Sequence, residues 1–123
     1  MVVEAADERY LPFNMSAGIN EDVAKQRGYN LDIYLEPITP MRNTLAGREE
    51  KGLMKMVVDS DTQDVLGMHM VGPEAGEIIQ GFATALKLGA KKQDVDATVG
   101  VHPSTAEEFC TMRKPSRHVP VTH

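Results

Sequence analysis

The sequence predicts an α+β domain, in which helices pack on one side of an antiparallel sheet of three to five strands. Two observations support this fold class. The apolar segments Leu53–Val58 and Val65–Val71 flank the turn-forming sequence DSDTQD, which is the pattern of an antiparallel hairpin. Apolar side chains then recur at helical spacing between Pro73 and Gly89, so this predicted helix has a stripe that can cover one face of the hairpin.

The N-terminal part of the chain predicts a strand followed by a short helix. Residues Tyr10–Ile19 have strand character, although Pro12 and Asn14 restrict such a strand to the edge of a sheet. Asn20 is a suitable N-cap, and the two acidic residues after it suit the positive end of the helix dipole. Gly28 stands where a left-handed residue would end this helix.

The next elements are strands whose alternation predicts their buried faces. Asn30–Thr39 alternates apolar and polar residues with the period of two that a half-buried strand shows. Pairing of Val58 with Leu66 in the hairpin would place four methionines on one face, with Met56 opposite Met68 and Met54 opposite Met70. Such a face could bind a soft metal or a partner, but the strand periodicity favours the alternative, a core face beneath a helix.

The remaining elements are short. Gln93–Thr98 predicts a helical turn. A last helix is expected at about Thr105–Met112, because Pro115 prevents its extension. Residues 1–11 are interpreted as a loose lead-in and residues 114–123 as a tail.

The composition is that of a globular protein, with 41% hydrophobic and 25% charged residues. A net charge of −5 argues against general binding to nucleic acid or anionic membranes, and no apolar segment is long enough to span a membrane. The one cysteine, Cys110, excludes an internal disulfide and a cysteine-rich metal site, and it favours the reducing cytoplasm. No glycine-rich phosphate loop is present, so we expect this chain to bind no dinucleotide and no metal by itself.

One segment, VGVHPSTAEEFCTMR at residues 99–113, carries candidate chemistry. His102 lies just before the predicted last helix, and Glu107 in its first turn is near enough to reach back to the imidazole. A carboxylate in that position would fix the tautomer of the ring and stabilise the imidazolium. The alternative is a capping box, in which Glu107 binds the backbone N–H of Ser104 and His102 is a surface residue.

The other candidate side chains are interpreted as structural. Cys110 lies within the predicted helix and has no partner thiol or histidine nearby in sequence, so a packed small side chain is favoured over a nucleophile. Three further histidines are expected to be structural or solvated: His69, His118 and His123.

Several segments resemble the C-terminal interface (dimerisation) domain of glutathione reductase, in the FAD-dependent pyridine nucleotide-disulfide oxidoreductase family. The sequence GVHPSTAEEF, followed by TMR, is similar to the C-terminal signature of that enzyme. Upstream, ITPMRNTLAG, GLMKMVVDSDTQDVLGMHMVGPEAGEIIQGFATALKLGA and DVDATVGVHP resemble consecutive blocks of the same domain. The blocks occur in order, and the resemblance predicts a dimerisation domain at residues 12–113.

The resemblance implies a site that two subunits share. The histidine that matches His102 protonates the leaving thiolate when glutathione disulfide is split, and the glutamate that matches Glu107 orients that histidine. The backbone at His102 and Pro103 is implied to approach the flavin of the partner subunit. Three further positions match residues that line the glutathione pocket: Met41, Glu108 and Thr111.

The resemblance also implies what this sequence lacks. The full enzyme is a homodimer with FAD and NADPH domains and a redox-active cysteine pair, none of which the sequence contains. We therefore expect no activity and no bound cofactor for the chain alone. Trypanothione reductases and dihydrolipoamide dehydrogenases share parts of the same signature, so the disulfide substrate stays open. A stand-alone dimerisation or binding module without catalysis is the alternative function.

Overall fold

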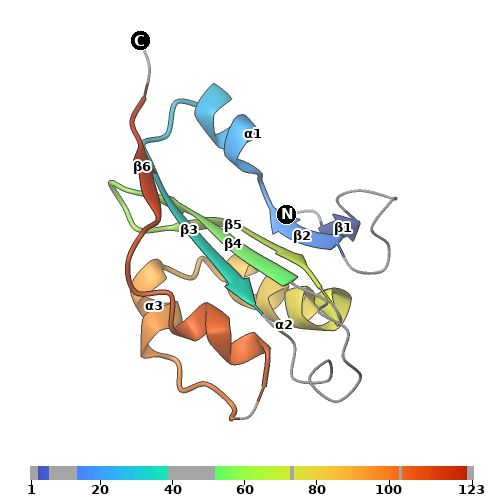
Figure 1. The fold of residues 1–123 in the computed structure, drawn as a ribbon. Helices are drawn as coiled ribbons and strands as arrows, with labels where there is room; N and C mark the ends of the chain where they lie inside the picture. Colours follow the sequence, from blue (N-terminus) through green and yellow to red (C-terminus); the bar gives the residue numbers. More distant parts are fainter. Residues whose placement is uncertain (1–2, 6–13, 39–51, 73, 103, 122–123) are drawn as a thin grey trace.

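The computed structural model of the 123-residue chain describes residues 3–5, 14–38, 52–72, 74–102 and 104–121. Within these residues, six strands form one antiparallel sheet in the order β1-β2-β5-β4-β3-β6 (Figure 1). In chain order the elements are β1 (Val3–Ala5), β2 (Asn14–Gly18), α1 (Glu21–Gln26), β3 (Leu31–Ile38), β4 (Gly52–Asp59), β5 (Val65–Val71), α2 (Ala75–Lys87), α3 (Lys92–Ala97), the 3₁₀ helix η3 (Ala106–Cys110) and β6 (Arg117–Val119). The predicted α+β class is confirmed.

Two short strands extend the sheet beyond the three to five that were predicted. Val3–Ala5, in the expected lead-in, pairs with β2, and Arg117–Val119, in the expected tail, pairs with β3. Each of these strands has three residues, too few for an alternation of apolar and polar residues to be recognised in the sequence. No helix in the described part of the chain is long and apolar enough to cross a membrane.

The β4–β5 hairpin has the predicted methionine pairs but a different pairing near its turn. Met54 pairs with Met70 and Met56 with Met68, as expected. Val58, however, pairs with Val65 rather than with Leu66, because a bulge shifts the register after Val57. The Asp59 carboxylate tightens the turn by accepting hydrogen bonds from Asp61 N at 2.9 Å and Thr62 Oγ1 at 3.0 Å.

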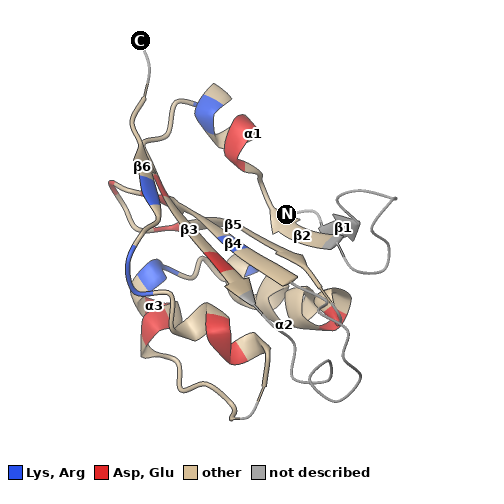
Figure 2. Ribbon diagram, viewed as in Figure 1, with Lys and Arg blue, Asp and Glu red and all other residues tan. Residues whose placement is uncertain are grey.

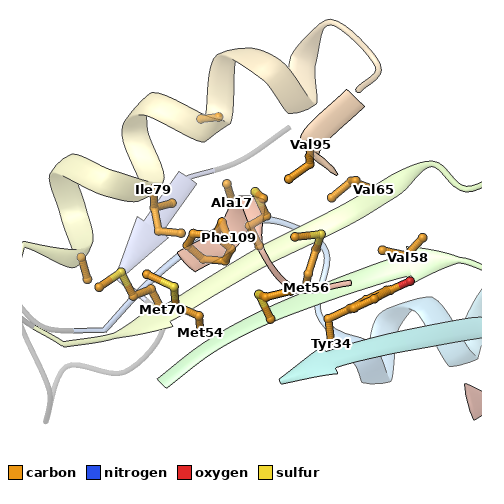
Figure 3. Packing of buried hydrophobic residues seen from close by; sticks show 14 residues of the cluster. Ala17, Tyr34, Met54, Met56, Val58, Val65, Met70, Ile79, Val95 and Phe109 are labelled. Carbon is orange, nitrogen blue, oxygen red and sulfur yellow. The ribbon is translucent and has the colours of Figure 1, made fainter. Parts of the chain in front are cut away.

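The methionine face is the main core of the domain. All four methionines are at most 1% exposed, and they pack beneath α2 together with Ile79 and Phe109 (Figure 3). The Phe82 and Phe109 rings meet edge to face, with centroids 4.9 Å apart. Burial of each such side chain contributes about 1.5–3 kcal/mol. The interpretation of the methionines as core is therefore confirmed.

A smaller cluster covers part of the opposite face of the sheet, which we call the second face. Leu31, Ile33 and Val57 are fully buried there against Ala24 of α1. The helices α2, α3 and η3 lie on the methionine side, as predicted, whereas α1 lies on the second face (Figure 1). The predicted caps of α1 are present: the side chain of Asn20 accepts from Val23 N at 2.9 Å, and Gly28 has a φ of 84°.

A buried carboxylate lies at the edge of the second face. Glu21 is 9% exposed and pairs with three cations, which are Lys25 and Lys55 at 2.9 Å each and Arg117, whose Nη1 is 2.8 Å from Glu21 Oε2. The hydrogen bonds from Arg117 are the largest influence and, with the two lysines, hold the pKa of Glu21 far below its ordinary value although burial acts to raise it.

Glu21 should make the fold sensitive to acid. Because its pKa in the folded chain lies below the ordinary value of 4.5, its contribution to the free energy of unfolding is complete above that value and is lost as the pH falls through 4.5 towards the folded pKa. We expect the Glu21→Gln chain to have a lower Tm than wild type at neutral pH and a shallower decrease of Tm in acid. Asp22→Asn, an exposed carboxylate in the same turn, is the matched control; parallel profiles for Glu21→Gln and wild type would contradict this prediction.

Candidate active site

The loop that carries His102 starts from a helix that is held firmly on the sheet. Lys92 of α3 is 2% exposed, pairs with Asp96, and has its Nζ 4.5 Å from the centroid of the Tyr34 ring. The side chain of Lys91 binds Asp64 Oδ1 at 2.8 Å, which ties the start of α3 to the β4–β5 turn. These contacts fix the point from which residues 98–102 leave the domain.

The element that follows the loop is shorter than predicted. In place of a helix over Thr105–Met112, the structure has the 3₁₀ helix η3, with five residues. Its position comes from packing, because Phe109, Cys110 and Met112 are all buried. Glu107 is in the first turn of η3, and so its backbone is held by the same core that holds the methionine face.

The structure brings His102 and Glu107 together. His102 Nδ1 lies 3.1 Å from Glu107 Oε1, with the histidine side chain 81% exposed and the glutamate side chain 21% exposed. Gly100 passes close to the same glutamate, since a Cβ on Gly100 would lie 2.7 Å from Glu107 Cβ. The backbone of the loop therefore packs directly against Glu107.

The structure shows no capping box at η3, although His102 is a surface residue, as that alternative also held. The N-cap residue of η3 is Thr105, whose side chain makes no capping hydrogen bond, and the Glu107 carboxylate turns to the imidazole instead. Ser104 Oγ is buried and has no hydrogen-bond partner among the described residues. The close approach of Gly100 to Glu107 and the burial of Ser104 Oγ were not predicted. In the sequence, the only sign of either feature is that both residues near His102 are small.

The geometry assigns different tasks to the two ring nitrogens of His102. A carboxylate can only accept hydrogen bonds, so Nδ1 must be the donor towards Glu107. In the neutral ring Nε2 then has the free lone pair, and in the imidazolium it has the exchangeable proton. Because the ring is mostly exposed, Nε2 is available to a group outside this domain.

The residues predicted to bind substrate are only partly described. Glu108 of η3 is half-buried, and Thr111, the C-cap residue after η3, is exposed and donates from Oγ1 to Glu108 O at 3.1 Å. Both lie within four residues of Glu107 in sequence, so the structure groups them with it. Met41 and Pro103 lie outside the described residues.

The side chains interpreted as structural have structural contacts. Cys110 is 6% exposed, which confirms a packed side chain, and burial raises the pKa of its thiol. His69 is held between Ser16 Oγ at 2.7 Å and Ile19 O at 3.2 Å, and burial lowers its pKa. His118 Nδ1 lies 3.0 Å from Asp32 Oδ1, while His123 is outside the described residues.

A groove of about 500 Å³ lies beside this loop, between α2, α3 and η3. Its floor is apolar, and the residues that line it include Ile78, Phe82, Val95 and Ala106. Large apolar side chains are also exposed nearby in sequence, with Val99 89% and Val101 77% exposed on either side of Gly100. The candidate acid/base pair thus adjoins an uncovered apolar surface.

The described residues contain no cluster of metal ligands, and the groove beside the loop does not suit a dinucleotide. Among them, no group of three or more histidine, cysteine or carboxylate side chains could hold a metal ion. The groove has acidic residues on its walls, from Glu74, Glu77 and Asp94, and so it does not fit the phosphates of a flavin or nicotinamide dinucleotide. Figure 2 shows acidic residues on α3 and η3 as well.

The fold agrees with the comparisons with known proteins. Residues 12–113 match the pyridine nucleotide-disulphide oxidoreductase dimerisation domain. This chain belongs to that family of dimerisation domains. The resemblance to the interface domain of glutathione reductase is thereby confirmed.

Three relatives show how similar the chain is to whole enzymes. It is 50% identical over 102 residues to a glutathione reductase of Burkholderia cepacia, covering 83% of this chain and 23% of the relative. It is 58% identical over 81 residues to a glutathione reductase of Nostoc sp., covering 66% of this chain and 18% of the relative. It is 36% identical over 102 residues to a trypanothione reductase of Leishmania donovani, covering 82% of this chain and 21% of the relative. The chain therefore spans about a fifth of the length of these relatives.

The orientation of His102 predicts its tautomer. With Glu107 as acceptor, the neutral ring should carry its proton on Nδ1, and ¹⁵N NMR of the ring nitrogens above neutral pH measures this directly. Glu107→Ala removes the acceptor, so we expect the ring to shift towards the Nε2–H form. Glu108→Ala, on the same turn, is the matched control and should leave the tautomer unchanged. Equal spectra for Glu107→Ala and wild type would contradict the pairing.

Proposed function

We propose that this chain supplies an acid/base pair, His102 and Glu107, to a glutathione-reductase-like disulfide reductase. The observation that carries the proposal is the geometry of the pair, in which Nδ1 is held by a carboxylate and the ring is 81% exposed. Glu107 orients the imidazole through Nδ1, and the rest of the ring faces away from this domain. Its reaction partner therefore belongs to another polypeptide, and similarity to two glutathione reductases supports glutathione disulfide as the substrate.

The chemical role of His102 in this proposal is proton transfer to sulfur. A cysteine thiolate of the partner attacks one sulfur of glutathione disulfide, which forms a mixed disulfide and releases a glutathione thiolate. Nε2–H of the His102 imidazolium gives its proton to that leaving thiolate, and the product is neutral glutathione thiol. Glu107 stabilises the imidazolium before transfer and keeps the ring aimed afterwards.

The proposal requires FAD and NADPH domains in addition to this dimerisation domain. In an enzyme of this kind, FAD and NADPH supply the electrons that regenerate the partner's cysteine pair, and they bind to the remaining domains. Glu108, Thr111 and Met41 are proposed to contact glutathione, and the backbone at Pro103 to approach the flavin of the partner. We place the protein in the cytoplasm, where a single unpaired cysteine stays reduced.

The groove beside the site is proposed to be a contact between two copies of the chain. A pair related by a twofold axis would cover the apolar floor formed by residues such as Ile78 and Phe82. The same contact would bring the exposed Val99 and Val101 near the second copy, next to His102. Dimerisation and completion of the site then follow from one interface.

A chimeric enzyme tests the catalytic proposal. We expect an enzyme in which this chain replaces the corresponding domain of the Burkholderia cepacia glutathione reductase to reduce glutathione disulfide with NADPH. His102→Gln should lower kcat/KM by about 100-fold or more, because a general acid is lost. His118→Gln, a histidine at the far edge of the sheet, should change it less than about twofold.

Three outcomes would decide between the alternatives. A chimera that keeps its flavin absorbance but is insensitive to His102→Gln would refute the acid/base role. Preference for trypanothione disulfide over glutathione disulfide would favour the trypanothione reductase relative. A folded chain that dimerises but supports no reduction in the chimera would favour a binding module without catalysis.

The dimer surface has its own test. Gly81 is exposed and lines the groove, and a Cβ added to it would meet no neighbouring atom within 4 Å, so Gly81→Glu adds a charge there without a clash inside the domain. We expect sedimentation equilibrium to show that this change raises the dimer Kd by about tenfold or more. Thr84→Glu, exposed on α2 but outside the groove, is the control, and an equal effect of both variants would contradict this contact.

A further inference from the structure

Residues 114–121, which we call the strap, are bound to the sheet although they lie beyond the residues 12–113 that match the family. Ser116 N donates to Ile33 O at 2.7 Å, and the Ser116 hydroxyl accepts from Leu35 N and donates to Leu35 O, both at 3.1 Å. At the other end of the strap, Val121 N donates to Asn30 Oδ1 at 2.7 Å. The strap is thus fixed before and after β6.

Two side chains of β6 connect the strap to the second face. Arg117 forms a forked pair with Glu21 of α1, a residue 96 positions earlier in the chain. Val119 packs against the apolar cluster that contains Leu31 and Ile33. Figure 1 shows β6 running beside β3, with α1 nearby. The Arg117–Glu21 pair therefore closes the strap across one end of the second face.

The strap changes the kind of edge that the sheet presents. Without it, the edge of β3 that faces away from β4 would be unpaired, and such an edge is a template for pairing with another chain. With it, the outermost strand is β6, which has three residues and lies between Pro115 and Pro120. Proline has no backbone N–H and interrupts strand pairing, so a short strand between two prolines is a poor template.

We propose that the strap guards the edge of β3 and that the Arg117–Glu21 pair is its latch. While the latch is closed, the outer backbone of β3 is occupied from Leu31 to Leu35, and a second copy of the chain cannot add a strand along that part. When it opens, β3 becomes available and the apolar cluster around Ile33 loses part of its cover. This role is independent of the proposed catalysis and of the groove beside α2.

Amide hydrogen exchange of the intact chain tests the latch. Arg117→Met should speed exchange at Ser116 and Leu35, whose amides bond across the strap, by about tenfold. Lys114→Met removes the same charge from the strap without contacting Glu21, and it should change these rates by less than about twofold. The amides of β4 and β5 are the internal reference for an intact fold. Unchanged exchange at Ser116 and Leu35 in Arg117→Met would overturn the latch.

Self-association of the chain tests whether the strap prevents pairing at the edge of β3. We expect the double variant Arg117→Met/Ser116→Ala, made with Gly81→Glu to suppress groove contacts, to associate about tenfold more strongly in sedimentation equilibrium than Gly81→Glu alone. Protection of β3 amides should increase with protein concentration in that variant. Faster exchange without stronger association would overturn the guarding role, and association without concentration-dependent β3 protection would also overturn it.

Discussion

Burial of Phe109 beneath α2 is the contact on which the candidate site depends. A 3₁₀ helix of five residues is too short to be stable alone, so η3 owes its position to the side chains that it buries. Phe109 is fully buried, and its ring meets Phe82 above the methionine face. Removing a buried phenylalanine side chain typically costs about 3–5 kcal/mol, more than enough to displace a helix of this size. The carboxylate of Glu107 is thus placed by packing two residues away.

The two faces of the sheet are stabilised in different ways. The methionine face is a continuous apolar layer under three helices, whereas the second face has a small apolar cluster and a buried carboxylate. Burial of a charge is costly unless it is paired, and Glu21 meets cations from α1, β4 and β6. One residue therefore joins three separate segments of the chain, and its loss affects all three together.

Local patterns in the sequence were sufficient where the interacting residues are close in the chain. The methionine pairs followed from strand periodicity, and contact of His102 with Glu107 followed from a spacing of five residues. The pairing of Val58 with Val65 was missed because it depends on a bulge after Val57, which the alternation of apolar residues does not report. The Glu21–Arg117 pair was missed for another reason: 96 residues separate its members, and no local pattern reports such a contact.

The difference in exposure within the His-Glu pair explains why the proposed chemistry needs a second chain. Glu107 is largely covered and its backbone is held by packing, whereas the ring beyond it is 81% exposed. A fully solvated imidazole has little advantage over water or buffer as an acid, because catalysis requires a fixed distance to the leaving group and exclusion of solvent. The exposed Val99 and Val101 beside it can exclude water only when another surface covers them. In the proposed enzyme, one docking event therefore both buries apolar side chains and surrounds Nε2, so that subunit association and proton transfer have a common physical cause.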